Sequence, residues 1–264
     1  MYEFNVHKPG SVADAVSALN GASDGKFLAG GQTLIPTLKQ RLAQPSDVID
    51  LGGISELKGI SDEGNAVKIG AMTTHAEVAT SDAVRSQIPA LADLASHIGD
   101  PQVRNRGTIG GSIANADPAA DYPAAIVGLN ATVHTNQRTI AADDFFTDLF
   151  ETALNDDEVV TAVSFPKPSR AGYAKFPNPA SRYAIVGVMV AETGGETRVA
   201  VTGAGPSVFR VADAESALAA NFSADALDSL SISSADLNSD IHASADYRAH
   251  LVGVMARRAV TAAS

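Results

Sequence analysis

The chain has 264 residues, a length typical of one large domain or of two to three smaller lobes. Its formal net charge is −11, and a diffusely acidic chain of this kind argues against binding to nucleic acid or to an anionic membrane. Because cysteine is absent, the chain has no disulfides, no thiolate nucleophile and no iron–sulfur cluster ligated wholly by its own residues.

The first 51 residues alternate between strand and helix patterns. Ser11 is a candidate N-cap for a helix over 11–19, since an acidic residue follows three positions later and apolar residues recur at helical spacing. Apolar runs at 26–29 and 48–51 are typical of strands, and a second helical pattern lies between them at 33–43. The order strand, helix, strand, helix, strand favours an α/β lobe.

Residues 54–168 mix short strands with helices and are expected to form a second lobe. The expected strands are 67–71, 131–134, 138–141 and 158–165, and the expected helices are 74–80, 88–98, 118–129 and 143–149. An irregular, glycine-containing segment at 99–112 lies between two of these helices. Pro166, Pro168 and Gly172 then indicate a boundary between lobes.

The remaining residues are expected to form a C-terminal unit of strands followed by helices. The expected strands are 173–176, 183–192 and 197–203, and the expected helices are 211–220 and 245–261. The Gly194–Gly195 pair indicates a hairpin between the last two strands. Arg248, Arg257 and Arg258 are expected to give the last helix a basic face, available to a partner subunit.

The N-terminal sequence lacks the pattern of a secretory signal. Glu3 stands where such a signal carries basic residues, and no apolar core follows. No stretch reaches the ~18 apolar residues that a membrane-spanning helix needs. We therefore expect a cytoplasmic protein that does not span a membrane.

Two glycine pairs are candidate anion-binding sites. Gly30–Gly31 belongs to the first glycine segment (29–33), between a strand and a helix start, and Gly110–Gly111 belongs to the second glycine segment (108–112). Glycine lets backbone N–H groups converge on an anion, because no Cβ blocks the approach and positive φ is accessible. Nearby hydroxyl groups add donors. The sequence therefore suggests a diphosphate held between two backbone cradles, and the alternative interpretation is two ordinary turns.

The common nucleotide-binding motifs are absent. Residues 21–27 are one residue short of a P-loop and carry Phe27 where Ser or Thr would bind magnesium. Residues 203–206 lack the third glycine of a Rossmann fingerprint. His75 and His97 stand alone, without the spacing of a metal site. We therefore expect any bound dinucleotide to be held in a non-Rossmann way.

Several motifs occur in the order in which a known family carries them. They are AGGQTLIP at 29–36, IGAMTTH at 69–75, IGDPQVRNRGTIGGS at 98–112 and ANADPAAD at 114–121. Weaker similarity extends through Lys175, SRYA at 181–184 and 240–248, so that the likeness covers nearly the whole chain. On these motifs the chain resembles the FAD-binding medium subunit of molybdenum hydroxylases. That family includes carbon monoxide dehydrogenase-type enzymes, and xanthine dehydrogenases contain the same module.

The resemblance implies an α+β fold. A two-lobed α/β FAD-binding domain of the PCMH and vanillyl-alcohol-oxidase type would occupy 1–168, with lobes at 1–53 and 54–168. A C-terminal domain at 169–264 would hold a three-stranded antiparallel sheet with helices. The chain would be an oxidoreductase subunit that passes electrons from [2Fe–2S] clusters through FAD to an external acceptor. The molybdenum cofactor and the clusters would belong to a large and a small partner subunit, assembled as a dimer of heterotrimers.

For the site, the resemblance implies that both glycine segments hold the FAD diphosphate. Asp121 matches a family position that touches FAD, Val160 an apolar flavin contact, and Lys175 a lysine near the cofactor. The charge of Lys175 would stabilise the anionic reduced flavin. No catalytic residue and no metal ligand is implied. The implied cofactor contacts are Leu28, Ala29, Gly30, Gly31, Gln32, Thr33, Leu34, Ile35, Thr73, Ile98, Thr108, Ile109, Gly110, Gly111, Ser112, Asn115, Asp117, Asp121, Val160 and Lys175.

Two other functions stay open on the residues alone. One is a stand-alone FAD oxidoreductase with its own substrate, and the other is a nucleotide-binding module without redox turnover. If the resemblance holds, carbon monoxide, an aldehyde, a purine or an N-heterocycle would bind on the large subunit, so this chain does not select among them.

Overall fold

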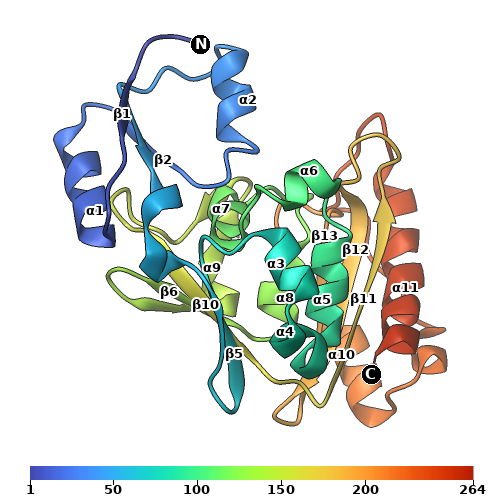
Figure 1. Ribbon diagram of the computed structural model, residues 1–264. Coiled ribbons are helices and arrows are strands. Elements are labelled where there is room, and N and C mark those ends of the chain that lie inside the picture. Colours follow the sequence, from blue (N-terminus) through green and yellow to red (C-terminus); the bar gives the residue numbers. More distant parts are fainter. Residues whose placement is uncertain (264) are drawn as a thin grey trace.

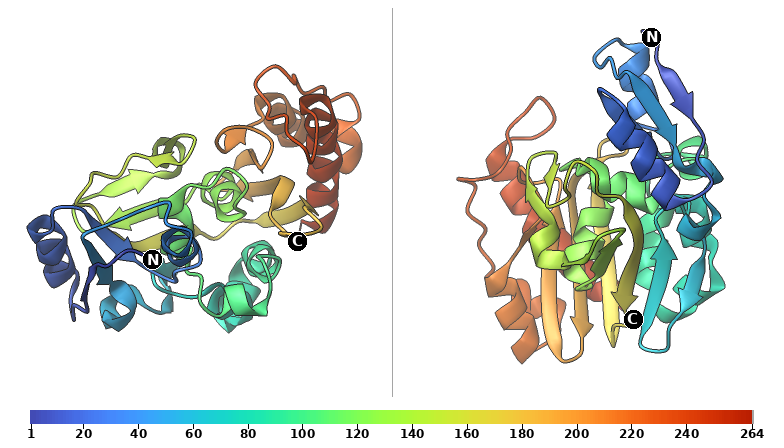
Figure 2. Two further views of the ribbon diagram at one scale, coloured as in Figure 1. Left: turned by 90° about the horizontal axis from the view of Figure 1, so that it is seen from above. Right: turned by 90° about the vertical axis from the view of Figure 1, so that its left-hand side faces the viewer.

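The computed structural model describes residues 1–263 and arranges three main sheets along the chain (Figures 1 and 2). A three-stranded parallel sheet comes first, a five-stranded antiparallel sheet follows, and a four-stranded antiparallel sheet completes the C-terminal part. This mixture of helices and sheets confirms the predicted α+β class. The final residue of the expected range 169–264 lies outside the described residues.

The N-terminal sheet confirms the alternation of strands and helices. Its elements are β1 (Asn5–His7), α1 (Val12–Gly21), β2 (Gly25–Leu28), α2 (Leu34–Lys39) and β3 (Asp47–Asp50), followed by the 3₁₀ turns η1 (Leu51–Gly53) and η2 (Ser55–Leu57). Ser11 caps α1, since its hydroxyl accepts a hydrogen bond from the backbone N–H of Asp14 at 3.1 Å. Helix α2 ends earlier than expected, because Arg41 adopts a left-handed φ of 61°.

The middle part places helices against one face of an antiparallel sheet. The strands are β4 (Ile60–Asp62), β5 (Ala66–Gly70), β6 (Thr132–Thr135), β7 (Thr139–Ala141) and β10 (Val160–Pro166), and β8 (Phe146–Asp148) and β9 (Glu151–Thr152) form a separate hairpin. The helices are α3 (His75–Thr80), α4 (Asp82–Gln87), α5 (Pro89–Ser96), α6 (Pro101–Arg104), α7 (Ile109–Asn115), α8 (Tyr122–Gly128) and α9 (Ala142–Phe145). Apolar side chains of β5, β6 and β10 share one core with those of α5, α7 and α8.

Several helices of this part differ from the sequence expectations. Helix α4 was not expected, and the segment 99–112, expected to be irregular, contains α6 and the start of α7. The helix expected from 118 begins instead at Tyr122, because Ala116 turns left-handed with φ 47° and Asp117 caps the following turn through the N–H of Ala119. Helix α9 is shorter than the expected 143–149, since the chain turns there into the β8–β9 hairpin.

The C-terminal sheet is sandwiched between helices. Its elements are β11 (Arg170–Pro177), β12 (Ala184–Thr193), β13 (Glu196–Thr202), β14 (Phe209–Arg210), α10 (Ala212–Ala220), η3 (Ala224–Leu227) and α11 (Ala245–Ala262). One face packs on the middle helices and the other on α11. The expected hairpin is present, with φ 60° at Gly194 and 85° at Gly195. The expectation of three strands is wrong by one, because β14 pairs with β13 over only two residues, too short for a sequence pattern.

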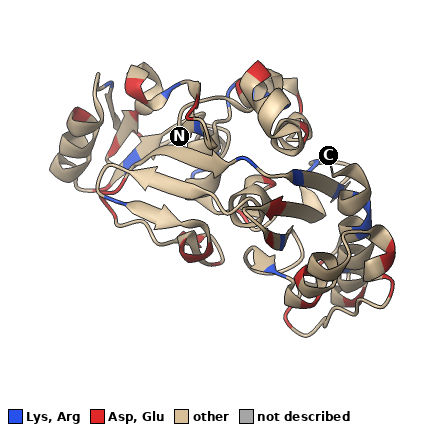
Figure 3. Ribbon diagram, turned by 90° about the horizontal axis from the view of Figure 1, so that it is seen from below, with Lys and Arg blue, Asp and Glu red and all other residues tan. Residues whose placement is uncertain are grey.

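Charged residues are spread over the molecule rather than gathered on one face. Figure 3 shows Lys and Arg interspersed with Asp and Glu on elements across this view. Among residues 1–263, no helix combines the length and the apolar character that crossing a bilayer requires.

Arg248 is buried, so the prediction that it belongs to an exposed basic face of the last helix is wrong. The residue is 4% exposed, and Nη1 donates to the carbonyl oxygens of Ile185 at 2.7 Å and of Gly203 at 2.9 Å. Its Nη2 pairs with Asp240 at 2.8 Å. Gly203 has φ 83° at the end of β13, so the guanidinium satisfies carbonyls that the sheet leaves unpaired there.

We expect Arg248→Leu to lower the free energy of unfolding by about 2–4 kcal/mol, because two buried carbonyls and a carboxylate lose their donor. Arg258→Leu on the exposed side of the same helix is the matched control, with an expected change within about 0.5 kcal/mol. Urea denaturation of both variants measures the difference. Equal effects at the two positions would contradict the structural role assigned to Arg248.

Candidate functional site

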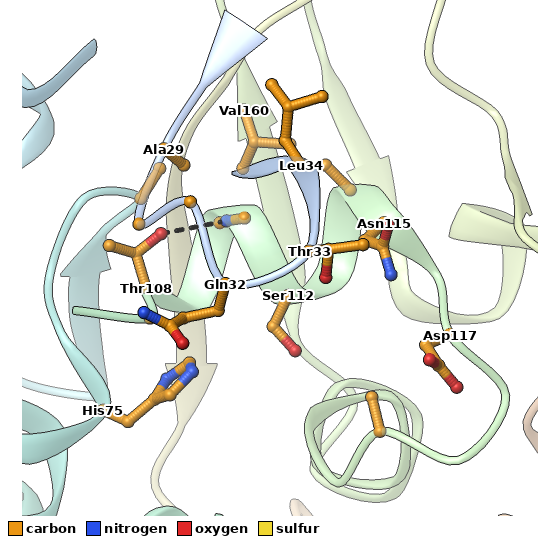
Figure 4. A pocket seen from close by; sticks show the side chains of 18 of the residues that line it. Ala29, Gln32, Thr33, Leu34, His75, Thr108, Ser112, Asn115, Asp117 and Val160 are labelled. Atoms are coloured by element: carbon orange, nitrogen blue, oxygen red, sulfur yellow. Dashed lines mark hydrogen bonds between the residues drawn. The ribbon is translucent and has the colours of Figure 1, made fainter. Parts of the chain in front are cut away.

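A cleft of about 670 Å³ opens between the N-terminal sheet, the middle helices and the start of the C-terminal sheet (Figure 4). Its walls come from both glycine segments, from residues 114–121, from 158–160 before and at the start of β10, and from 181–183 between β11 and β12. A cleft of about 300–1,000 Å³ is typical of a cofactor or small-molecule site.

The first glycine segment touches the chain that leads into α7. A Cβ added to Gly30 would lie 2.1 Å from the carbonyl oxygen of Arg106 and 2.7 Å from Cα of Gly107, so no other residue fits here. Gly31 has φ 73°, which L side chains rarely adopt. Within residues 1–263, the backbone N–H groups of 30–33 meet no hydrogen-bond acceptor. This segment therefore offers consecutive unpaired donors on the wall of the cleft, as the sequence suggested.

The second glycine segment differs from that expectation. The N–H groups of 109–112 are already bonded: that of Ile109 donates to the Thr73 carbonyl at 3.1 Å, and that of Gly110 to the Ala71 carbonyl at 2.8 Å. The N–H of Gly111 donates to the Thr108 hydroxyl at 3.2 Å, which caps α7. This segment is therefore tied to residues 71–73 rather than forming a second free backbone cradle.

The donors that α7 offers to the cleft are side chains. Ser112 and Asn115 both line the cleft, and neither side chain makes a hydrogen bond to another described residue. Figure 4 shows them on α7 beside Thr33 of the first segment. Gly110 instead permits packing, since an added Cβ would lie 2.5 Å from Cβ of Ala71.

A buried ion pair closes one wall of the cleft. Asp121 is 4% exposed and accepts hydrogen bonds from the Tyr173 hydroxyl at 2.5 Å and from Nζ of Lys175 at 2.9 Å. Lys175 also donates to the His97 carbonyl at 3.1 Å. Burial raises the pKa of Asp121, and the neighbouring Lys175 opposes that rise. Asp121 lines the cleft, whereas Lys175 stands behind it and does not.

Most of the residues expected at the site do line the cleft. Leu28 and Ile35 do not; they lie behind Gly31, 3.3 and 2.9 Å from where its Cβ would be. Thr73 and Ile109 are buried outside the cleft, with the Thr73 hydroxyl bonded to the backbone of Gly59. Those that line it are Ala29, Gly30, Gly31, Gln32, Thr33, Leu34, Ile98, Thr108, Gly110, Gly111, Ser112, Asn115, Asp117, Asp121 and Val160.

Sequence reasoning missed several residues of the cleft. Burial and the nearby Asp117 and Asp121 raise the pKa of Tyr183, which lies in the loop between β11 and β12. Sequence motifs covered only some of these residues: SRYA covers this loop, IGAMTTH covers Met72 and His75, and IGDPQVRNRGTIGGS covers Val103. The other missed residues include Phe27, Met72, His75, Val103, Leu154, Glu158 and Val159.

Glu158 is held ionised at the edge of the cleft. Hydrogen bonds from Arg138, opposed by burial and supported by the Thr135 hydroxyl, lower the pKa of Glu158 to about 2. The backbone N–H of Asn155 donates to the same carboxylate at 3.0 Å. The carboxylate thus connects β6, the segment before β10 and the cleft wall.

We expect Arg138→Met to lower the free energy of unfolding at pH 7, because the charged Glu158 loses its strongest donor. The pKa of Glu158 lies below the unfolded value of 4.5 in the folded chain, so this contribution is present above pH 4.5 and is lost as the pH falls towards 2. Urea denaturation at several pH values measures it. A difference between wild type and variant that does not shrink below pH 4.5 would argue against this assignment.

Comparison with known proteins matches nearly the whole chain to the family that the sequence motifs resemble. Residues 2–168 match the family described as the FAD binding domain in molybdopterin dehydrogenase, and residues 171–263 match the CO dehydrogenase flavoprotein C-terminal domain. The chain belongs to the FAD-binding medium subunits of molybdenum hydroxylases. The predicted family, its oxidoreductase class and its cofactor FAD are thereby confirmed.

Individual relatives of this medium subunit cover nearly all of it. It is 39% identical to the nicotine 6-hydroxylase medium subunit of Paenarthrobacter nicotinovorans, over 97% of this chain and 95% of the relative. It is 37% identical to the carbon monoxide dehydrogenase medium chain of Hydrogenophaga pseudoflava, over 98% and 96%. The solved reconstituted CO dehydrogenase of Oligotropha carboxidovorans superposes with a TM-score of 0.89 at 35% identity, covering 99% of this chain and 97% of that one.

The cleft of this medium subunit fits FAD. The unpaired N–H groups of 30–33 suit a diphosphate, and the contact at Gly30 leaves the loop no room for a Cβ. Leu154, Val159 and Val160 give the cleft an apolar surface suited to an aromatic ring. Among residues 1–263, no group of three or more His, Asp or Glu side chains is placed to hold a metal ion.

Proposed function

We propose that this medium subunit holds FAD in the cleft and relays electrons within a molybdenum hydroxylase. The observation that carries the proposal is the row of unpaired backbone donors at 30–33, on a loop that Gly30 sets against the entry to α7. When bound, FAD would supply the chemistry to take up two electrons singly and to pass them to an external acceptor. The chain itself needs to bind and orient the cofactor, which agrees with a site rich in backbone and hydroxyl donors.

Each wall of the cleft has its part in this proposal. The first glycine segment holds the diphosphate, and Ser112 and Asn115 add side-chain donors from α7. Val160 contacts the flavin ring. Lys175 acts on the flavin from behind Asp121, since it does not line the cleft itself. The remaining contacts are those expected from the family resemblance that lie on the cleft.

The proposed partners are a large subunit with the molybdenum cofactor and a small subunit with [2Fe–2S] clusters, assembled as a dimer of heterotrimers. The relatives named medium subunit or medium chain support a large and a small partner, and the lack of cysteine in this chain supports clusters held by a partner. The proposed domains are 1–168, with lobes 1–53 and 54–168, and 169–264; the family matches that meet between 168 and 171 support them. The expected cytoplasmic location belongs to the same proposal, and fractionation of the host cell tests it.

Purification of the chain alone and with its two partners tests the proposal. We expect one FAD per chain by visible absorbance, and reduction of that flavin by the substrate of the complex only when all three subunits are present. Turnover of a substrate by this chain alone would favour a stand-alone oxidoreductase. A chain that binds FAD neither alone nor in the complex would contradict the proposal.

A further inference from the structure

His75, the first residue of α3, is a cleft residue to which the family resemblance assigns no role. The residue is 5% exposed, and within residues 1–263 its Nδ1 is enclosed and has no hydrogen-bond partner. Nε2 makes no hydrogen bond to a described residue either, but it is not among the enclosed atoms. Nε2 is therefore the ring nitrogen that the cleft reaches. Figure 4 shows the imidazole projecting towards Gln32.

The surroundings of His75 decide where its proton lies. Burial, with a smaller effect of the Arg104 charge, lowers the pKa of His75 to about 4, so the ring is neutral at pH 7. A neutral imidazole carries one proton, on either nitrogen. A proton on Nδ1 would be a buried donor without an acceptor, whereas a proton on Nε2 can be donated into the cleft. The enclosure of Nδ1 therefore favours the Nε2–H tautomer.

Nε2 lies next to Gly107, which in turn touches the loop with the unpaired backbone donors. A Cβ added to Gly107 would lie 2.6 Å from Nε2 of His75, and a Cβ added to Gly30 would lie 2.7 Å from Cα of Gly107. In space, Gly107 thus lies between His75 and Gly30. The backbone N–H of His75 also donates to the Gly107 carbonyl at 3.0 Å. This bond fixes His75 relative to Gly107.

We propose that His75 donates a hydrogen bond from Nε2 to a diphosphate oxygen of bound FAD, as a neutral donor beside the backbone N–H groups of 30–33. The inference rests on the proposed function of the cleft. The free chain presents the neutral imidazole at this position, because burial and the nearby Arg104 charge disfavour an imidazolium. The second glycine segment does not supply a cradle for the diphosphate, because its N–H groups are bonded. His75 would supply a donor in its place, from the α3 side of the cleft.

Two amide variants of the full chain test the role of Nε2. The amide of His75→Gln places its N–H near the position of Nε2, whereas that of His75→Asn ends near the position of Nδ1. We expect His75→Asn to raise the Kd for FAD about 10- to 100-fold, and His75→Gln to raise it by less than about 10-fold. ADP, which carries the diphosphate without the flavin, should lose affinity by the same factor as FAD.

The outcomes separate this inference from the proposed function. A wild-type chain that binds no FAD contradicts the proposed function. A wild-type chain that binds FAD while His75→Asn binds it equally well overturns the inference, and so does a loss for FAD that ADP does not share. Tyr122→Phe is the matched control: its hydroxyl is also enclosed without a partner and its ring centroid lies 5.4 Å from that of His75, yet FAD affinity should not change.

Nitrogen-15 NMR of the wild-type histidine side chains gives a readout that does not depend on the folding of a variant. We expect His75 to carry its proton on Nε2 in the free chain, and the Nε2–H resonance to shift when ADP is added. A proton on Nδ1, or an Nε2–H signal indifferent to ADP, would overturn the inference.

Discussion

Replacing Gly30 with alanine is expected to abolish retention of FAD. The new Cβ would lie 2.1 Å from the carbonyl oxygen of Arg106, a backbone atom that cannot rotate away. Relief requires the first glycine segment to move by an ångström or more, because carbon and oxygen atoms in contact stay more than about 3 Å apart. The unpaired N–H groups of 30–33 would then leave the positions that face the diphosphate. We expect the Kd for FAD to rise at least about 100-fold, measured by equilibrium titration.

Gly21→Ala is the control for this variant. Gly21 ends α1, and an added Cβ would meet open space beyond its own helix backbone and chain neighbours. FAD affinity should therefore equal that of the wild type. Circular dichroism of Gly30→Ala separates a displaced loop from an unfolded chain. A folded Gly30→Ala chain that keeps stoichiometric FAD would show that the first glycine segment does not hold the diphosphate.

The same geometry changes the interpretation of the second glycine pair. A side chain at Gly110 would collide with Ala71, at 2.5 Å from its Cβ, so valine there would disturb core packing before it reached any ligand. From the sequence, both pairs present the same local chemistry. What distinguishes them is that Thr73 and Ala71 accept the N–H groups of the second segment, and these acceptors lie more than thirty residues away along the chain.

The sequence predicted the elements that local interactions specify and missed those that depend on residues far away along the chain. Strands β2, β12 and β13 and helices α1 and α11 were predicted close to their bounds, because apolar periodicity and local caps specify them. Helix α6 and strand β14 were not, since they span four and two residues and depend on neighbouring elements. Arg248 was predicted to lie on the exposed basic face of the last helix. Helical spacing does not reveal that unpaired carbonyls of the C-terminal sheet lie against the first turn of that helix.

The candidate site was predictable where a family motif or a glycine pair marked it. No role in the site was predicted for His75, because a lone histidine in a sequence gives no sign of an enclosed Nδ1. Asp121 and Lys175 were predicted separately as cofactor contacts. Their pairing could not be read from the sequence, since it joins the turn before α8 to strand β11 across 54 positions.

We expect Lys175→Met to lower the free energy of unfolding by about 3–5 kcal/mol, since it leaves the Asp121 carboxylate buried without its cation. The double variant Asp121→Asn/Lys175→Met should be less destabilised than Lys175→Met alone, because an amide still accepts from the Tyr173 hydroxyl and carries no charge. Urea denaturation of the cofactor-free single and double variants measures this coupling. Additive effects would contradict a buried ion pair.

The same variants separate the stability role of Lys175 from its proposed effect on the flavin. Removing a positive charge behind the cleft wall disfavours the anionic reduced form, so the midpoint potential of FAD bound to Lys175→Met should fall below that of the wild type. In the double variant the neighbouring negative charge is also gone, and most of that fall should be reversed. A potential equal in all three proteins would restrict Lys175 to holding Asp121, and the electronic tuning of the flavin would then have to come from residues on the cleft itself.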